Sequence, residues 1–254
     1  MNANLKGTVT LVTGAGTGIG AAISRTLAGQ GAAVVLVGRR LAQLEDVAAQ
    51  IRARGGSASV FAADISHRAR AALAVDHAIS EFGRLDIVVN NAGVMLIGPV
   101  ADAPDGEWER MIDVNLKGAL YITQAAIPHL QKSAGAGPRQ VADIVNISST
   151  AGRVARPGTA VYNLTKFGIN AFSEALRQEL QPQRVRVGVI EPGNVDTDLA
   201  SHTRPELLES VRSQINSIER LTPEDIADAV AYMVGRPRRV AVNEMLVRAA
   251  DQSW

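Results

Sequence analysis

A glycine-rich turn between a short apolar segment and a helical one constrains this chain more than any other feature. Residues 9–12 are apolar or β-branched, and Thr-Gly-Ala-Gly-Thr-Gly-Ile-Gly follows them at residues 13–20. Helical periodicity begins at Ile19, within the turn. Glycine lets a backbone turn sharply and approach a ligand closely, while a helix N-terminus offers free N–H groups to phosphate. The order of strand, turn and helix therefore predicts a dinucleotide-binding α/β fold.

Two spacings fit the glycines of this turn. Gly16, Gly18 and Ala21 match the pattern Gly-x-Gly-x-x-Gly/Ala. Gly14, Gly18 and Gly20 match Gly-x-x-x-Gly-x-Gly, which is better placed relative to the strand end. A glycine turn without a ligand is the alternative interpretation, and the position of this turn beside the first strand argues against it.

Strand-like and helix-like segments alternate along the chain. The expected strands are Val9–Val12, Ala33–Val37, Val60–Ala62, Leu85–Val89, Ile144–Ile147, Val185–Ile190 and Val242–Val247. The expected helices are Ile19–Leu27, Leu41–Arg54, Ala69–Phe82, Met111–Leu130 and Val161–Leu180. Apolar strands separated by helices indicate a parallel sheet covered on both faces, because each crossover lays a helix back over the sheet. We therefore expect one domain over residues 1–254, a doubly wound (Rossmann) α/β fold with a seven-stranded parallel sheet and helices on both faces.

One segment interrupts this alternation. Residues 196–219 are polar and charged, and they include a possible helix from Glu206 to Ile218. We interpret the segment as a substrate lid. Thr222 and Pro223, followed by two acids, then predict the start of a helix that continues through Met233, because threonine caps a helix, proline suits its first turn and acids complement its dipole.

Composition excludes several classes of function. The chain carries 26 Lys plus Arg against 25 Asp plus Glu, so the net charge of +1 offers no broad basic surface to nucleic acid. The absence of cysteine excludes disulfides, thiolate metal sites and cysteine nucleophiles, and the four histidines lack metal-ligand spacing. No segment approaches the ~20 apolar residues of a membrane span, and the first residues lack the core of a signal peptide. We expect a cytoplasmic protein that binds no metal, nucleic acid or membrane.

The second expected strand ends in two arginines. In dinucleotide folds that prefer NAD, an acid at this position holds the ribose 2′-hydroxyl. Here Arg39 and Arg40 stand at the start of a helix, where cations oppose the helix dipole. A guanidinium that binds the 2′-phosphate of NADP with bidentate geometry would account for this placement. The alternative is a solvated arginine pair.

A tyrosine and a lysine form the candidate catalytic pair. Tyr162 and Lys166 are four positions apart in a helical segment, so both project from one face. A tyrosine titrates near ~10, but a neighbouring ammonium favours the phenolate and lowers its pKa. Ser149 follows the strand Ile144–Ile147, at the sheet edge where doubly wound folds bind ligands. Taken alone, the tyrosine and lysine also fit an ordinary pair on a helix surface.

Together these motifs resemble the short-chain dehydrogenase/reductase family over nearly the whole chain. The matching features are the glycine turn, Asn90–Gly93, Asn115, Ser149, Tyr162, Lys166 and Pro192-Gly193. The resemblance implies that Ser149 orients the substrate oxygen, that Tyr162 is the general acid or base, and that Lys166 binds the nicotinamide ribose and lowers the tyrosine pKa. It also implies that Asn115 holds a helix kink and a water that relays protons to the lysine. Local irregularity is expected there because asparagine is a weak helix former.

The resemblance further implies a site for NADP or NADPH. Its expected contacts are Gly14, Thr17, Gly18, Ile19, Arg39, Asp64, Ile65, Asn91, Gly93, Tyr162, Lys166, Pro192, Gly193, Val195 and Thr197. Asp64 and Ile65 would flank the adenine. Some NADP-binding relatives carry a basic residue within the glycine turn, whereas this chain has Thr17, so the 2′-phosphate contact rests on Arg39.

The substrate is a small molecule whose pocket we expect between residues 94–97, the loop after Ser149, Asn163 and the lid. The apolar residues 95–97 either line that pocket or pack beneath the lid. Arg153 and Arg156 could meet a substrate carboxylate or form a solvated pair. Residues 95–100, 167–172 and 242–248 resemble a subgroup that includes clavulanic acid dehydrogenase and broad 3-hydroxy acid dehydrogenases, which implies an aldehyde or ketone substrate. Family members are commonly tetramers, so we expect a homotetramer or a dimer with interfaces on the helices 111–130 and 161–180.

Two functions compete at this stage. The first is an NADPH-dependent carbonyl reductase or alcohol dehydrogenase with Tyr162 as general acid or base. The second is a dinucleotide-sensing regulator of the same fold, which typically loses the catalytic tyrosine or lysine. Asn115, Ser149, Tyr162 and Lys166 are all present in this sequence, which favours the enzyme. A dehydratase or epimerase is disfavoured because no added C-terminal substrate domain is present in the sequence.

Overall fold

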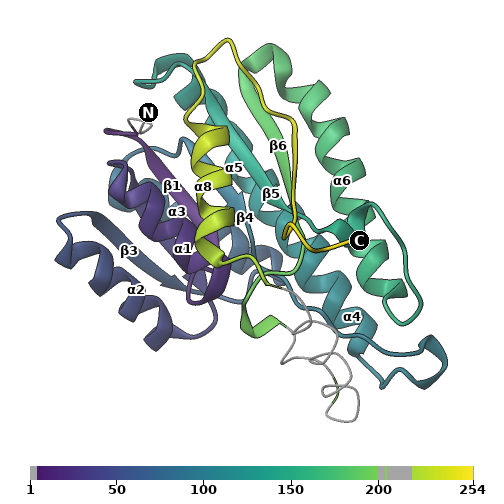
Figure 1. The fold of residues 1–254 in the computed structure, drawn as a ribbon. Coiled ribbons are helices and arrows are strands. Elements are labelled where there is room, and N and C mark those ends of the chain that lie inside the picture. The colour runs from purple at the N-terminus through teal and green to yellow at the C-terminus, as the bar shows by residue number, and fades with distance from the viewer. Residues whose placement is uncertain (1–4, 200–203, 205–218, 254) are drawn as a thin grey trace.

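The seven strands form one parallel sheet (Figure 1). The computed structural model describes residues 5–199, 204 and 219–253. The strands are β1 (Val9–Thr13), β2 (Ala33–Gly38), β3 (Ser57–Ala62), β4 (Ile87–Asn90), β5 (Ala142–Ile147), β6 (Val185–Pro192) and β7 (Glu244–Val247). Their order is β3-β2-β1-β4-β5-β6-β7, and every neighbouring pair is parallel. Strand order reverses between β1 and β4, as in a doubly wound fold, which confirms the predicted fold class.

Helices cover both faces of this sheet (Figure 1). The helices on one face are α1 (Gly18–Gly29), α2 (Leu41–Ala53) and α8 (Pro223–Val234). Those on the other face are α3 (Arg68–Phe82), α5 (Ala119–Ala136) and α6 (Ala160–Leu180). Because side chains alternate along a strand, Val34 and Leu36 of β2 enter the first core, whereas Val35 and Val37 enter the second. Apolar strands of this kind are stable only when both faces are covered.

Some boundaries differ from the sequence-based expectation. β3 begins at Ser57, ahead of the predicted Val60, because Ser57 already pairs with Ala33 of β2. β7 begins at Glu244, after the predicted Val242, since the register with β6 starts with Val189 opposite Glu244. The helix expected over 111–130 is divided into α4 (Glu107–Ile112), a π-helical turn (Asp113–Gly118) and α5. Among residues 5–199, 204 and 219–253, the remaining helical elements are 3-10 turns at Val100–Asp102, Thr150–Gly152 and Gln181–Gln183.

The proposed lid lies largely outside the described residues. Of the segment 196–219, the structure describes residues 196–199, 204 and 219, and the possible helix from Glu206 to Ile218 is not among them. The helix that follows is as predicted: the Thr222 hydroxyl accepts from the Asp225 N–H, and the Asp225 carboxylate accepts from the Thr222 N–H in a reciprocal cap.

Charged pairs gather at the amino ends of the central strands, opposite the glycine turn. Arg186 at the start of β6 binds Asp143 of β5 through two hydrogen bonds of 2.7 and 3.1 Å. Both side chains are buried, with 10% and 3% exposure. Arg139 adds a 2.5 Å hydrogen bond to the same carboxylate. These pairs tie the amino ends of β5 and β6 together, far along the strands from the residues predicted to be functional.

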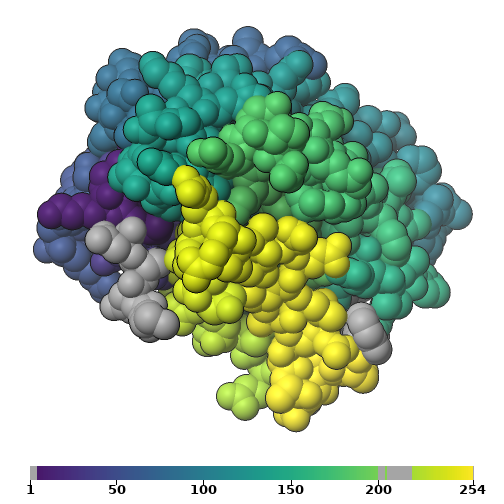
Figure 2. Space-filling view, turned by 90° about the horizontal axis from the view of Figure 1, so that it is seen from above, coloured from purple at the N-terminus to yellow at the C-terminus, as the bar shows by residue number. Residues whose placement is uncertain are grey.

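The C-terminal segment lies on the molecular surface, drawn in yellow in Figure 2. It contacts the loop that follows β6: the Gly193 N–H donates to the Val247 carbonyl at 2.8 Å, and the Asn194 N–H donates to Gln252 Oε1 at 2.9 Å. The last described turn of the chain therefore supports the loop on which the sequence predicts coenzyme contacts.

Candidate active site

The glycine turn leaves no room for a side chain at Gly14 or at Gly20. Gly14 has a φ of +64°, and a methyl group there would lie 2.9 Å from Asn91 Nδ2. A methyl group on Gly20 would lie 2.2 Å from the Gly14 carbonyl oxygen. Asn91, at the end of β4, donates Nδ2 to the Thr13 carbonyl at 2.9 Å and its backbone N–H to the Thr13 hydroxyl at 3.0 Å. The favoured spacing of Gly14, Gly18 and Gly20 therefore includes the two positions where a side chain would clash. Asn91 holds the turn in place from the neighbouring strand.

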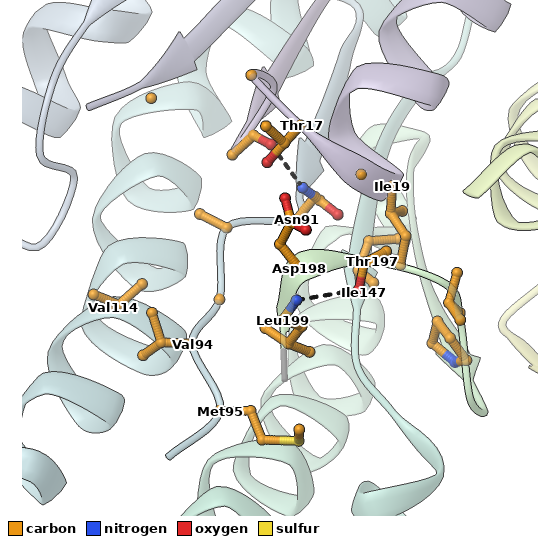
Figure 3. A pocket seen from close by; sticks show the side chains of 18 of the residues that line it. Thr17, Ile19, Asn91, Val94, Met95, Val114, Ile147, Thr197, Asp198 and Leu199 are labelled. Carbon is orange, nitrogen blue, oxygen red and sulfur yellow. Dashed lines mark hydrogen bonds between the residues drawn. The ribbon is translucent and has the colours of Figure 1, made fainter. Parts of the chain in front are cut away.

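A cavity of about 460 Å³ runs along the carboxyl ends of the strands. Every residue predicted as a coenzyme contact lines it: Gly14, Thr17, Gly18, Ile19, Arg39, Asp64, Ile65, Asn91, Gly93, Tyr162, Lys166, Pro192, Gly193, Val195 and Thr197. Figure 3 shows Thr17 and Ile19 toward one end, Met95 and Val94 toward the other, and Asn91 between them. Its size is within the usual range for cofactor pockets. The close-packed glycine cradle, and a lining that extends from Arg39 to Tyr162, together fit a dinucleotide.

Two arginines and a carboxylate frame one end of the cavity. Arg39 and Arg40 both line it, and Arg40 donates Nη2 to the Thr17 hydroxyl at 3.3 Å. Asp64 accepts hydrogen bonds from the Ser66 N–H and hydroxyl at 3.0 and 2.7 Å. Burial raises the pKa of Asp64, but these bonds and the charge of Arg39 outweigh it, so the pKa lies below its ordinary value. Both arginines that end the second expected strand therefore line this end of the cavity.

Tyr162, Lys166 and Ser149 line the cavity beside the ends of β5 and β6. Tyr162 and Lys166 are 5% and 6% exposed. Lys166 Nζ donates to the Ile147 carbonyl at 2.9 Å and lies 5.7 Å from the centre of the Tyr162 ring. The Ser149 hydroxyl accepts from the Ala151 N–H at 3.0 Å, which fixes the turn that follows β5. The structure thus brings together the three residues that the sequence predicted to share a site.

Burial is the largest influence on the pKa values of Tyr162 and Lys166. It raises the pKa of Tyr162 to about 12, and a hydrogen bond with Ser149 opposes the rise. It lowers the pKa of Lys166 from 10.5 to about 8. The pKa of Tyr162 is therefore raised, not lowered as the family resemblance implies, because desolvation outweighs the hydrogen bond with Ser149. At neutral pH the phenol is protonated and the ammonium is the major form of the lysine.

Asn115 lies behind the cavity, in the π-helical turn Asp113–Gly118. It does not line the cavity, and it is 4% exposed. Its amide pairs with the backbone of Val94 and donates to the Thr165 hydroxyl at 3.1 Å. Thr165 in turn donates to the Tyr162 carbonyl at 2.8 Å. The predicted irregularity at Asn115 is present as a π-helical turn, and Thr165, which sequence reasoning missed, connects it to α6.

The end of the cavity near Tyr162 is partly apolar. Val94, Met95 and Leu199 line it (Figure 3), and Leu96 packs in a cluster with Tyr162 instead. Asn163 does not line the cavity, which differs from the expected substrate contact. Its amide donates to the carbonyls of residues 151 and 154 at 2.7 and 3.0 Å, because the loop before α6 needs these backbone groups satisfied.

Arg153 and Arg156 differ in their surroundings: Arg153 is engaged with carboxylates, whereas Arg156 is exposed, as the solvated alternative predicted for it. Arg153 binds the carboxylates of Glu191 and Glu244, both within this chain. Arg156 donates its backbone N–H to Asn163 Oδ1 at 3.3 Å. Arg220 also lines the cavity and binds Asp196 at 2.9 Å. No sequence signal identified Arg220 or the Glu191 partner, because both depend on contacts between distant segments.

Comparison with known proteins decides the family. The sequence pattern of the family described as short chain dehydrogenase matches residues 8–208. The chain belongs to this family. This short-chain dehydrogenase is 34% identical over 254 residues to an uncharacterized oxidoreductase of Staphylococcus saprophyticus, across 98% of this chain and 99% of that protein. Family membership makes the chain an oxidoreductase that uses a nicotinamide dinucleotide.

Two solved structures of similar sequence share the fold. A metagenomic short-chain oxidoreductase in complex with NADP has 34% identity and a TM-score of 0.81, with 97% of this chain and 99% of that chain covered. The 3-ketoacyl-(acyl-carrier-protein) reductase from Brucella melitensis complexed with NADH has 34% identity and a TM-score of 0.85, with 97% and 98% covered. One relative thus holds NADP and the other NADH, so similarity alone does not assign the preferred coenzyme of this short-chain dehydrogenase.

Two kinds of feature are absent from residues 5–199, 204 and 219–253, the part of the chain that the structure describes. Among those residues, no group of three or more His, Cys, Asp or Glu side chains is arranged to hold a metal ion. None of the helices described for this short-chain dehydrogenase combines the length and apolar character that a membrane crossing requires.

Proposed function

We propose that this short-chain dehydrogenase reduces an aldehyde or ketone to an alcohol with NADPH, or carries out the reverse oxidation, with Tyr162 as the general acid or base. The observation that carries the proposal is the meeting of Tyr162, Ser149 and Lys166 in one cavity with the glycine turn. A proton donor, an orienting hydroxyl and a cation beside a dinucleotide site are what carbonyl reduction requires.

Each side chain has a distinct role in this proposal. The coenzyme supplies the hydride. The Ser149 hydroxyl holds the carbonyl oxygen of the substrate, and Tyr162 Oη donates a proton to that oxygen. Lys166, held by the Ile147 carbonyl, stabilises the phenolate that remains and binds the nicotinamide ribose. Asn115 holds the backbone beside the lysine and a water in a proton relay.

The resting protonation state supports the reductive direction. A phenol with a pKa of about 12 carries its proton at neutral pH and is ready to donate it. Oxidation of an alcohol would instead begin from the phenolate, whose population is small in the free protein. A charged Lys166 favours the phenolate as the proton leaves, so the cation acts where charge develops.

NADP preference rests on the arginines at the end of β2. Arg39 and Arg40 both line the cavity, and the described residues there include no acid at the position that holds a ribose 2′-hydroxyl in NAD-preferring folds. Two guanidinium groups favour a phosphate of charge about −2 by charge-assisted hydrogen bonds. The NADP complex of the metagenomic relative is compatible with this assignment.

The substrate proposal is limited to a class. Val94, Met95 and Leu199 give the reacting end of the cavity an apolar wall, which suits an aldehyde or ketone with an apolar substituent. This wall agrees with the resemblance to the subgroup of clavulanic acid dehydrogenase and broad 3-hydroxy acid dehydrogenases. A screen of NADPH oxidation over aldehydes, ketones and 3-oxo acids identifies the substrate.

We also propose that the chain is one domain that assembles as a homotetramer or dimer. Strands from residue 9 to residue 247 share one sheet, which supports a single domain. Leu120 of α5 and Leu164 and Phe167 of α6 are 37%, 58% and 43% exposed, and an interface would remove these apolar side chains from water. Light scattering with size exclusion gives the mass, and a monomer at micromolar concentration would contradict the assembly.

The deciding experiment is Tyr162→Phe, which removes the phenolic hydroxyl and leaves the ring. We expect this variant to bind NADPH and to reduce no carbonyl, because the proton donor is gone. Full turnover by the variant would overturn the mechanism. NADPH binding without turnover by the wild-type protein across the whole screen would favour the alternative, a dinucleotide-sensing regulator.

A further inference from the structure

A fully buried carboxylate joins the three elements that carry the active site. Glu191 lies at the end of β6, directly before the Pro-Gly loop, and is 0% exposed. Arg153 donates Nε and Nη2 to its two oxygens at 2.7 and 2.8 Å. Asn170 of α6 donates Nδ2 to the same carboxylate at 2.6 Å and to the Gly152 carbonyl at 3.2 Å. One side chain thus connects the serine turn, α6 and the Pro-Gly loop, which lines the cavity beside the end of β5, at the Tyr162 end.

Each partner of this carboxylate is close in sequence to a reacting group. Arg153 ends the 3-10 turn that Ser149 begins, and its N–H donates to the Thr150 carbonyl at 2.9 Å. Asn170 lies one helical turn beyond Lys166 on α6. A shift of Glu191 would therefore be passed to Ser149 through the turn, and to the Pro-Gly loop directly along the chain.

The ion pair of Arg153 and Glu191 restricts the relative orientation of the two side chains more than an apolar contact would. A bidentate bond between a guanidinium and a carboxylate fixes both planes relative to each other. Glu191 is fully buried whereas the Arg153 side chain is 39% exposed, so the desolvation penalty falls mainly on the carboxylate, and an apolar side chain at its position would avoid that penalty. Arg153 Nη2, which donates to Glu191, also donates to Glu244 of β7, so the edge strand contacts the same guanidinium. This geometry favours a role in positioning over one in stability alone.

We propose that Arg153 and Glu191 are positioning residues, whose bidentate pair sets the Ser149 turn against the Pro-Gly loop and thereby aligns the substrate oxygen with the coenzyme. The inference rests on the proposed carbonyl reduction. It assigns no contact with substrate or coenzyme to either side chain. Its physical basis is that a displacement of about 1 Å in a reacting group lowers the rate by about 100-fold.

A matched pair of variants separates positioning from stability. Arg153→Lys and Arg186→Lys each keep a positive charge and lose a bidentate bond to a buried carboxylate, the first at the carboxyl ends of β5 and β6 and the second at their amino ends. We expect both variants to lower the melting temperature. Only Arg153→Lys should lower kcat, by about 10- to 100-fold. A similar loss of kcat in both variants, or in neither, would overturn the proposal.

Coenzyme binding gives a second readout that needs no turnover. We expect Arg153→Lys to weaken the binding of NADPH several-fold. The affinity for 2′-phospho-ADP-ribose, which lacks only the nicotinamide, should stay unchanged. Equal weakening of both ligands, or of neither, contradicts positioning of the loop. If Arg153→Lys does not fold, Glu191→Gln, which keeps the shape of the side chain, replaces it with the same expectations.

The two proposals fail separately. Full turnover by Tyr162→Phe removes the proposed mechanism, and the NADPH and 2′-phospho-ADP-ribose affinities then still decide the positioning role. An inactive Tyr162→Phe together with equal effects of the two lysine variants removes only the positioning role.

Discussion

The side chain of Asn115 forms two hydrogen bonds with the backbone of Val94: Oδ1 accepts from the Val94 N–H at 2.8 Å, and Nδ2 donates to the Val94 carbonyl at 2.9 Å. The second proton of Nδ2 goes to the Thr165 hydroxyl at 3.1 Å. The buried amide is therefore used as both donor and acceptor. It joins the π-helical turn to the loop after β4 and to α6, the two segments that flank the reacting end of the cavity.

Replacing this amide by a carboxylate should damage both stability and rate. In Asn115→Asp the acceptor for the Val94 N–H remains, but a second oxygen faces the Val94 carbonyl in a buried site. We expect the free energy of unfolding to fall by about 1–3 kcal/mol, the usual cost of an unsatisfied buried polar group. Urea denaturation measures it, and kcat should fall because Val94 lines the cavity. An unfolding free energy equal to that of the wild type would contradict the assigned contacts.

Two glycines of α1 should respond to alanine in opposite ways. A methyl group on Gly20 would lie 2.2 Å from the Gly14 carbonyl, so Gly20→Ala should distort the turn, destabilise the protein and abolish NADPH binding. A methyl group on Gly29 would meet nothing within 4 Å, so Gly29→Ala should raise the free energy of unfolding by about 0.4–1 kcal/mol with unchanged affinity. Thermal unfolding and NADPH titration compare the two, and tight binding by Gly20→Ala would refute the role of the turn.

The arginine at the end of β2 should control coenzyme choice. Arg39→Asp replaces a cation by an acid that can hold a ribose 2′-hydroxyl, so the preference for NADPH over NADH should fall. The loss of a charge-assisted bond of about 1.5–3 kcal/mol corresponds to roughly 10- to 100-fold in the ratio of kcat/KM values. Arg54→Asp, the same charge change at the other end of α2, is the control and should leave the ratio unaltered. An unchanged ratio in Arg39→Asp removes this assignment.

Lys166 should give activity and stability opposite trends with pH. Its pKa of about 8 means that the ammonium is present below pH 8 and is lost above it. We expect kcat for reduction to decline as the pH rises through about 8, while Tyr162, with a pKa of about 12, stays protonated. The unfolded chain regains the ordinary lysine pKa of 10.5, so between pH 8 and 10.5 it binds more protons than the folded protein. The contribution of Lys166 to folding stability therefore rises with pH over that window.

The measurement is kcat at saturating substrate and NADPH from pH 6 to 10, together with unfolding free energies over the same range. Subtracting the stability profile of Lys166→Met isolates the lysine contribution. A rate that is constant across pH 8 in the wild type would contradict the assigned role of the ammonium.

The parts of this structure that sequence predicts are those set by local chemistry. The glycine turn, the alternation of strands and helices, and the polar residues at strand ends each follow from neighbouring residues, and parallel strands bring those ends to one edge. This is why Gly14, Arg39 and Tyr162 line one cavity although they are distant in the chain.

The parts that sequence does not predict depend on distant partners. Arg153 and Glu191 are 38 positions apart, and no sequence feature near Arg153 indicates that it binds a buried carboxylate. Asn163, expected to meet substrate, is occupied by loop carbonyls whose positions depend on tertiary folding. The tyrosine pKa was expected to be lowered by charge, and it is raised by burial, which only a three-dimensional structure can reveal.

The strand order has a genetic consequence. The arginine-bearing end of the cavity comes from β1 to β3 and the turns after them, before Gly83, whereas Tyr162, Lys166 and the apolar wall come from the chain after it. Gly83 ends α3 in a left-handed conformation, at a loop between the two regions. A recombination joint at that loop would exchange the arginine-bearing region between homologous genes and leave the tyrosine-bearing region intact. One crossover could therefore change the coenzyme preference of such a chain and leave its substrate specificity unaltered.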